Sequence, residues 1–153
     1  MSTTTLQALI FDVDGTLADT ESAHRAAFNH AFAELGLGWE WDEALYTELL
    51  NISGGKERIL HYWKLAHPDI KALNGQAVTE TINRIHELKT AAYESAVNSG
   101  AVRLRPGVLE LMAEAMEQDV QFAIDTTPQP AHFATLLRPA AGPHGGMTFT
   151  PLW

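Results

Sequence analysis

The chain has 153 residues, with 19 acidic and 10 basic side chains, a net charge of −9 and no cysteine. Its length suits a single globular domain, and the missing cysteine excludes disulfides, thiolate metal sites and a cysteine nucleophile. The few basic residues are scattered among acids, so we expect neither nucleic acid nor an anionic membrane as a partner.

No stretch of the sequence approaches the ~20 apolar residues of a membrane span. The first five residues also lack the basic region of a secretory signal. We therefore expect a cytoplasmic protein.

The first half of the chain predicts one strand followed by four helices. Residues 6–11 are an apolar run typical of a strand buried on both faces of a parallel sheet. Thr20 is a candidate N-cap for a helix to about residue 35. Further helices are predicted over 42–50, from 53 or 54 to 66, and over 79–98, and these four helices form one insertion.

The second half predicts a helix, a strand and a last helix. The first helix runs to about residue 118 with Pro106 in its first turn, the strand covers 120–124, and the last helix covers 129–137. Residues 139–153 read as an irregular tail. This order predicts an α/β fold, in which a partial core of residues 1–19 and 100–138 is interrupted by a helical cap of residues 20–99.

The string FDVDGTLADTE carries the strongest chemical signal. Asp12 directly follows the first strand, so we expect it at the carboxyl edge of the sheet, where open α/β folds bind ligands. Asp14 lies two residues on, and in an extended chain both carboxylates point the same way, a repulsion that Mg²⁺ would relieve. Asp12 is then a candidate nucleophile and Asp14 a candidate general acid and base. The alternative is a solvated strand-to-helix turn.

This motif resembles the first motif of the haloacid dehalogenase (HAD) superfamily of phosphohydrolases. The segments DTESAHRAAFNHAF, GGKERI and LRPGVLELMAEA resemble its CbbY-type branch, sugar-bisphosphate phosphatases related to phosphoglycolate phosphatases and β-phosphoglucomutases. The resemblance covers residues 6–138 and implies a Rossmann-like core with an inserted α-helical cap. It also implies Mg²⁺ held by the Asp12 carboxylate and the Asp14 carbonyl, and a phosphoryl group held by Thr126 and Thr127.

Within the predicted cap, Gly54, Gly55, Lys56 and Arg58 look like the substrate-specificity loop of the family. Glycine allows close backbone approach, and two cations at a helix start can clamp a second phosphate. The alternative is an ordinary helix N-terminus with solvated charges.

Two further residues, Glu21 and His24, lie near the expected cap hinge, where the family places polar contacts to substrate and nucleophile. For His24 the alternative is a residue on the helix surface. His86 is isolated in the sequence and receives no functional role. The tryptophans at 39, 41 and 63 are expected in the cap core.

The sequence departs from the family pattern after Asp125. Residues 126–153 contain no acid and no lysine, so neither the lysine motif nor the acidic pair that follow the second motif is present. Asp125 itself puts a carboxylate beside the phosphate position. We expect a C-terminally truncated or frameshifted member that turns over poorly, with an exposed sheet edge prone to self-association.

The resemblance implies a Mg²⁺-dependent phosphatase of small sugar phosphates or bisphosphates that works through an aspartyl-phosphate. A phosphohexomutase uses the same aspartate pair and stays open as an alternative. A non-catalytic remnant that binds a ligand or a partner through its cap is the alternative from a different class.

Overall fold

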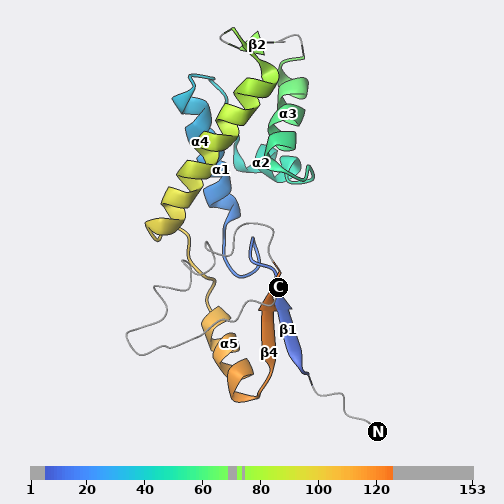
Figure 1. Cartoon of the computed structure of the whole chain (residues 1–153), viewed down its shortest axis with the longest axis vertical. Helices are drawn as coiled ribbons and strands as arrows, with labels where there is room; N and C mark the ends of the chain where they lie inside the picture. The colour runs from blue at the N-terminus through green and yellow to red at the C-terminus, as the bar shows by residue number, and fades with distance from the viewer. Residues whose placement is uncertain (1–5, 69–71, 74, 126–153) are drawn as a thin grey trace. The chain divides into compact units, whose positions relative to one another are not determined.

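The computed structural model describes residues 6–68, 72–73 and 75–125 (Figure 1). The elements in chain order are β1 (Ala8–Phe11), α1 (Glu21–Glu34), α2 (Glu43–Leu49), α3 (Gly55–Ala66), β2 (Ala72–Leu73), β3 (Gln76–Ala77), α4 (Val78–Asn98), α5 (Val108–Glu117) and β4 (Gln121–Ile124). Two compact units divide the chain: one is Ser22–Ser95, and the other joins Met1–Glu21 to Ala96–Trp153. The predicted helix at 129–137 and the tail at 139–153 lie outside the described residues.

β1 and β4 form a parallel pair and lie side by side (Figure 1). Ala8 pairs with Gln121 and Phe11 with Ile124, so the carboxyl ends of the two strands coincide. Parallel strands need a long crossover connection, and here that connection contains all five described helices. Both predicted strands and the mixed α/β character are confirmed.

The prediction that the first strand is buried on both faces is wrong for the described part of the chain. β1 alternates exposed and half-buried residues, and the Ile10 side chain is 74% exposed. Burial on both faces needs a packed layer on each side of a sheet. Among the described elements, α5 packs against β4 and supplies one such layer.

The loop between β1 and α1 folds tightly around the carbonyl group of Val13. This carbonyl accepts hydrogen bonds from the backbone N–H groups of Thr16, Leu17 and Ala18 over 3.2, 3.0 and 3.2 Å. Leu17 and Ala18 are buried, and the Leu17 carbonyl accepts from the N–H of Arg105 over 2.8 Å. The loop is therefore fastened to the segment that leads into α5.

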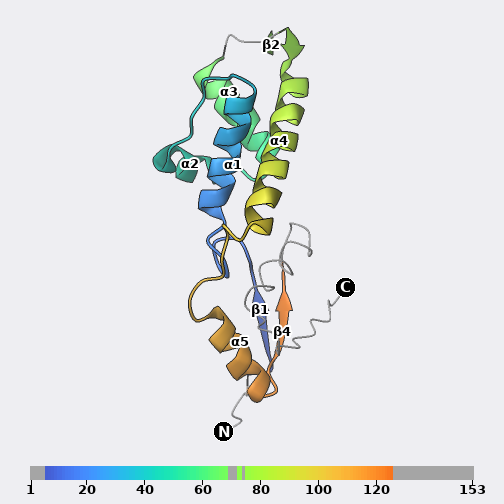
Figure 2. The same cartoon turned by 90° about the vertical axis from the view of Figure 1, so that its left-hand side faces the viewer.

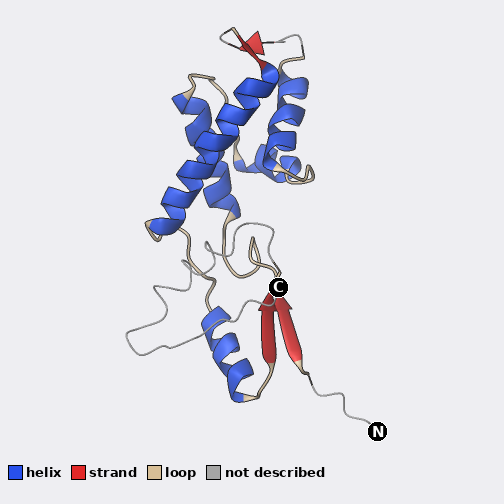
Figure 3. Cartoon of the chain, in the orientation of Figure 1, coloured by secondary structure: helices blue, strands red, loops and turns tan. Residues whose placement is uncertain are grey.

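The helical unit consists mainly of α1 to α4, and α1 and α4 run side by side in both views (Figures 1 and 2). α2 begins where the sequence predicts, because the Asp42 carboxylate caps it by accepting from the Leu45 N–H over 2.8 Å. α3 ends at Ala66, before Pro68, and α4 covers the predicted long helix. The short antiparallel hairpin of β2 and β3, drawn red among the blue helices of Figure 3, was not predicted.

Two predicted helix starts are wrong in detail. Thr20 precedes α1, but its Oγ1 atom is buried and makes no hydrogen bond, so it does not cap the helix. Pro106 lies before α5 rather than in its first turn. α5 begins after Gly107, whose φ of 86° places it in the left-handed region that glycine adopts without strain.

An aromatic core fills the helical unit. The Trp41 ring lies 4.7 Å from the Phe28 ring and 4.9 Å from the Phe32 ring, between centroids, and all three side chains are almost fully buried. Trp63 is also buried and Trp39 packs against this cluster, which confirms the prediction that these tryptophans belong to the cap core. Burying one such side chain stabilises a fold by roughly 1.5–3 kcal/mol. In the part of the chain that the structure describes, no helix combines the length and apolarity needed to cross a bilayer.

Candidate active site

Asp12 lies at the carboxyl edge of the β1–β4 pair, as the sequence predicts. It follows Phe11, whose carbonyl accepts a hydrogen bond from the Asp125 N–H over 2.8 Å. Asp12 and Asp125 thus leave two paired strands at the same edge, and both residues are exposed. The edge presents two carboxylates rather than one.

The Asp12 side chain is held by its own loop. The Thr16 hydroxyl donates to Asp12 Oδ2 over 3.0 Å. Gly15, with a φ of 72°, makes the turn that brings Thr16 back to Asp12. This hydrogen bond limits the rotation of the Asp12 carboxylate, which suits a nucleophile.

Asp14 sits one residue further into the same turn. It is half-buried, follows the buried Val13 and forms an isolated parallel bridge with Ala18. The two predicted catalytic aspartates therefore occupy one short, tightly hydrogen-bonded loop.

The donors of this loop suit a hard cation. Asp12 offers carboxylate oxygen and Asp14 a backbone carbonyl, and Mg²⁺ is usually held by one or two carboxylates, several waters and a substrate phosphate. Among the described residues, no group of three or more His, Asp or Glu side chains gathers closely enough to bind a metal. The described part of the chain thus offers such an ion one carboxylate and one backbone carbonyl, and no denser group of ligands.

The predicted phosphoryl-binding pair, Thr126 and Thr127, lies outside the described residues. The last described residue is Asp125, which directly follows β4 at the same edge as Asp12.

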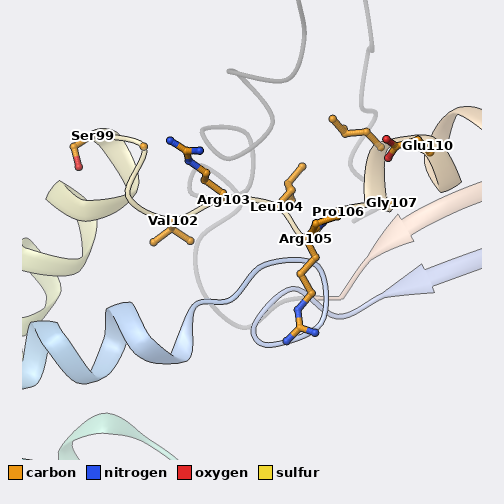
Figure 4. Close-up of a pocket in the computed structure, with 10 residues that line it drawn as sticks. Ser99, Val102, Arg103, Leu104, Arg105, Pro106, Gly107 and Glu110 are labelled. Carbon is orange, nitrogen blue, oxygen red and sulfur yellow. The ribbon is translucent and has the colours of Figure 1, made fainter. Parts of the chain in front are cut away.

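A hollow of about 500 Å³ runs along the segment between α4 and α5 (Figure 4). Its lining includes Arg103, Arg105 and Glu110, while Asp12 and Asp14 do not belong to it. In Figure 4 the Arg105 side chain extends toward the loop after β1, in keeping with the hydrogen bond from its N–H to the Leu17 carbonyl. The lining of the hollow does not include the aspartates, and the hollow was not predicted from the sequence.

In the helical unit, His24 contacts α4 rather than lying freely on the helix surface. Its ring stacks on Tyr93, with centroids 3.9 Å apart and an interplanar angle of 16°. Lys89 Nζ lies 5.3 Å from the centre of the same Tyr93 ring and 5.2 Å from that of Phe28. Both distances allow a cation–π interaction. Glu21, the other predicted hinge residue, is the half-buried first residue of α1.

The two glycines at the start of α3 have close neighbours from this chain itself. Gly54 has a φ of 89°, and the Glu57 carboxylate occupies the place of its missing side chain. A Cβ at Gly55 would lie 3.0 Å from Cδ2 and 3.1 Å from Nε2 of His86. The space beside the two glycines is taken by the side chains of Glu57 and His86, and the predicted approach of a substrate to this turn stays a prediction.

Arg58 has a structural task in the helical unit. Its Nε donates to the Leu49 carbonyl over 3.0 Å, and its terminal nitrogens donate to the Ile52 carbonyl and the Tyr46 hydroxyl over 3.2 and 3.3 Å. The guanidinium thus ties the end of α2 to α3. This engagement separates Arg58 from Lys56, which is exposed at the start of the helix.

His86 and Lys89 are functional candidates that the sequence interpretation missed. Burial, followed by the charges of Lys89 and Lys56, lowers the pKa of the His86 imidazole, and Glu57 acts in the opposite direction. Both lysines therefore lie close enough to His86 to affect its charge. The spacing of residues 86, 89 and 93, at i, i+3 and i+7, was the available signal for one shared helix face.

These contacts connect two of the predicted cap residues, His24 and Gly55, to side chains of α4. His24 stacks on Tyr93, Tyr93 and Phe28 contact Lys89, and His86 contacts Gly55. We call the exposed or half-buried group of Lys56, His86 and Lys89 the cap cation cluster. The cluster contains residues of both α3 and α4 but does not include Arg58.

The sequence matches the family model described as haloacid dehalogenase-like hydrolase over residues 9–140. The chain belongs to this family. The resemblance noted from the motifs is therefore confirmed, and the parallel strand pair with its large helical insertion is the corresponding architecture.

Among curated relatives, the plasmid-encoded protein CbbY of Cupriavidus necator is 53% identical over 137 residues, which are 90% of this chain and 53% of the relative. Protein CbbY of Cereibacter sphaeroides is 39% identical over 137 residues, or 90% of this chain and 56% of that protein. This chain thus spans about half the length of the curated relatives it matches.

A solved structure shows the same arrangement of elements. It is a crystal structure of a CbbY variant from Rhodobacter sphaeroides in complex with xylulose-1,5-bisphosphate, with 39% identity and a TM-score of 0.69. The match covers 88% of this chain and 56% of that chain. The likeness supports the HAD-type fold for the part that the two chains share.

Proposed function

We propose that this chain carries the nucleophile loop and the specificity cap of a Mg²⁺-dependent phosphatase for small sugar phosphates or bisphosphates. The observation that carries the proposal is the position of Asp12 at the carboxyl edge of β1, with its carboxylate held by Thr16. Membership of the family and the likeness to a CbbY structure that holds a sugar bisphosphate support the same substrate class.

The two aspartates divide the chemistry. A carboxylate oxygen of Asp12 attacks phosphorus, the ester P–O bond breaks, and the electron pair stays on the departing sugar oxygen, to which Asp14 gives a proton. Asp14 then takes a proton from water, whose oxygen attacks phosphorus. The bond to Asp12 breaks, inorganic phosphate leaves, and both carboxyl groups return to their starting states.

The surrounding groups offset the charge of the phosphoryl group. Mg²⁺, when bound by the Asp12 carboxylate and the Asp14 carbonyl, supplies positive charge beside the transferring phosphate. Thr126 and Thr127 follow β4 and complete the proposal as phosphoryl ligands. The exposed Asp125 carboxylate works against them, and residues 126–153 contain no lysine, so we expect slow turnover.

The cap is proposed to recognise the rest of the substrate. Lys56 at the start of α3 and Lys89 on α4 are the cations suited to a second phosphate, and Gly54 and Gly55 shape the turn beside them. Arg58 supports this site indirectly, because it fixes the α2–α3 connection. Glu21 and His24 stay proposed contacts at the cap hinge.

Replacement of the nucleophile tests the reaction. Asp12→Asn keeps the size of the side chain but removes its charge, and losses of a nucleophile are typically about 10⁴-fold or more. Release of inorganic phosphate from sugar phosphates in millimolar Mg²⁺ measures turnover, and mass spectrometry of the trapped protein locates the phosphorylated residue. The exposed Asp19, in the same loop, supplies the matched control Asp19→Asn, which should keep its activity. An Asp12→Asn protein as active as the parent would end the proposal.

Removal of the cap cations tests the substrate class. Lys56→Ala and Lys89→Ala should each weaken binding of a sugar bisphosphate by about 2 kcal/mol, roughly 30-fold in KM, and change little for a small monophosphate. Lys64→Ala, an exposed lysine at the other end of α3, is the control. Equal losses on both substrates would place the second phosphate elsewhere.

A further inference from the structure

His86 is the one member of the cap cation cluster whose charge can change near neutral pH. It lies on α4, three residues before Lys89, and the Cδ2–Nε2 edge of its ring lies against Gly55 at the start of α3. A side chain at Gly55 would displace this ring. The imidazole is therefore held at the junction of two helices that each contribute a lysine.

The charged groups that act on His86 come from both of these helices. From α3 they are Lys56 and Glu57, and from α4 the group is Lys89, while α1 contributes the uncharged Phe28 ring beside Gly55 and Lys89. Burial and the two lysines lower the pKa of His86 and outweigh Glu57. Burial and the two lysines thus favour the uncharged imidazole in the free protein.

We propose that His86 is a positioning residue for the second phosphate: it takes up a proton when a doubly charged anion binds between Lys56 and Lys89, and so strengthens the binding of doubly phosphorylated sugars as the pH falls. This inference rests on the proposed function, in which these lysines bind the phosphate of the substrate that does not react. It assigns His86 a role that the two lysines, with their fixed charges, cannot perform.

The physical reason is charge balance. A dianion between the lysines offsets the two charges that disfavour the imidazolium, and the bulk solvent then supplies a proton to the ring nitrogen. Linkage is reciprocal: if the anion favours the protonated ring, the protonated ring favours the anion by the same factor. Anion affinity therefore rises as the pH falls through the range in which His86 of the complex becomes protonated, and is constant above it.

Inorganic sulfate is the probe, because its charge does not change near neutral pH, whereas a phosphate ester titrates in the same range as histidine. The imidazole protons of the 153-residue chain are followed by NMR from about pH 5.5 to about pH 8, with and without saturating sulfate. His86→Asn identifies the resonance of His86. Sulfate should move the His86 titration to higher pH, and sulfate affinity should fall about fivefold between these limits in the parent but not in His86→Asn.

His61→Asn, which removes a half-buried histidine of α3, should keep the pH dependence of the parent. Sulfate that binds at the lysines without moving the His86 titration would overturn the role of His86 and leave the second-phosphate site in place. Sulfate that leaves the resonances of Lys56 and Lys89 unchanged would overturn both. The Asp12 chemistry is decided separately by the phosphate-release assay.

Discussion

The helical unit and the β1–β4 pair differ in how completely they bury their apolar side chains. In the helical unit Phe32 and Trp41 are fully buried, and the surrounding core residues come from α1 to α4. By contrast, Ile10 of β1 is 74% exposed, Leu6 just before β1 is 61% exposed, and Met116 of α5 is 51% exposed. The unit that carries the proposed specificity residues closes its own core, and the unit that carries Asp12 leaves apolar surface open in the described part of the chain.

This difference separates two tasks. The substrate selection that we propose needs fixed positions for a few cations, and a packed helical unit suits that task. Nucleophilic attack needs Asp12 held by a sheet, and the sheet here has two described strands, whereas the matching relatives are almost twice as long. We propose that the exposed strands also account for any self-association of the chain, because unpaired strand edges favour pairing with a second copy.

Truncation of one apolar side chain in each unit tests this difference in burial most directly. Phe32→Ala should lower the free energy of unfolding of the helical unit by about 3–5 kcal/mol, because it leaves a cavity in a closed core. Ile10→Ala should change stability by no more than about 0.5 kcal/mol. Urea unfolding followed by tryptophan fluorescence measures both, since three of the four tryptophans, at 39, 41 and 63, belong to this unit.

The Ile10 variant needs a second probe, because no tryptophan lies in β1. Far-ultraviolet circular dichroism and size-exclusion chromatography of Ile10→Ala supply it. An Ile10→Ala protein that unfolds as readily as Phe32→Ala would show that the strand face is buried in solution, and the contrast between the two units would be lost.

Much of the fold could be predicted from the sequence, because helix caps and apolar periodicity agree with the tertiary contacts. Asp42 marks the start of α2 by a side-chain cap, and the apolar periodicity of residues 82, 85 and 88 marks α4. The β2–β3 hairpin was missed because two-residue strands carry no period. The burial of β1 was misjudged because an apolar run shows what a strand can bury and not whether a second layer covers it.

The candidate site was predictable where one segment carries it. Asp12, Asp14 and the turn at Gly15 lie within four successive residues, so motif and geometry coincide. The cap cation cluster joins α3 and α4, about 30 positions apart by the numbers of Lys56 and His86, and no local pattern shows that pairing. For Arg58 the sequence shows the positive charge, but it does not show which backbone carbonyl groups accept its hydrogen bonds.

A second prediction concerns the helical unit alone. It distinguishes a residue that stabilises the fold, Arg58, from a residue proposed to bind substrate, Lys56. Arg58→Ala should cost about 2 kcal/mol of unfolding free energy, because two backbone carbonyls lose a charged donor. Lys56→Ala should stay within about 0.5 kcal/mol of the parent, since Lys56 is exposed. Urea unfolding of both variants checks this.

Arg58→Lys is the informative intermediate. One ammonium cannot reach both carbonyls with the fixed fork of a guanidinium, so we expect only partial recovery of stability. If Arg58→Ala were as stable as the parent while losing bisphosphate selectivity, the clamp role indicated by the sequence would replace the structural one.

The smallest expected effect is a pH dependence of the helical unit that originates at His86. Burial and the charges of Lys89 and Lys56 lower the pKa of His86 in the folded chain below its ordinary value of about 6.5. The unfolded chain therefore binds this proton at higher pH than the folded one, so stability is fully present above about pH 6.5 and is lost as the pH falls through the folded pKa. The effect is small because the imidazole is only half-buried and keeps part of its hydration.

His86→Asn should remove this part of the acid sensitivity. Lys56→Gln should weaken it, because one of the two positive charges that disfavour the protonated imidazole is gone. Urea midpoints from tryptophan fluorescence at a series of pH values measure all three proteins. If the parent and His86→Asn lost stability equally on acidification, the junction of α3 and α4 would not constrain the charge of His86, and the helical unit would be as loosely packed there as the strand pair is at Ile10.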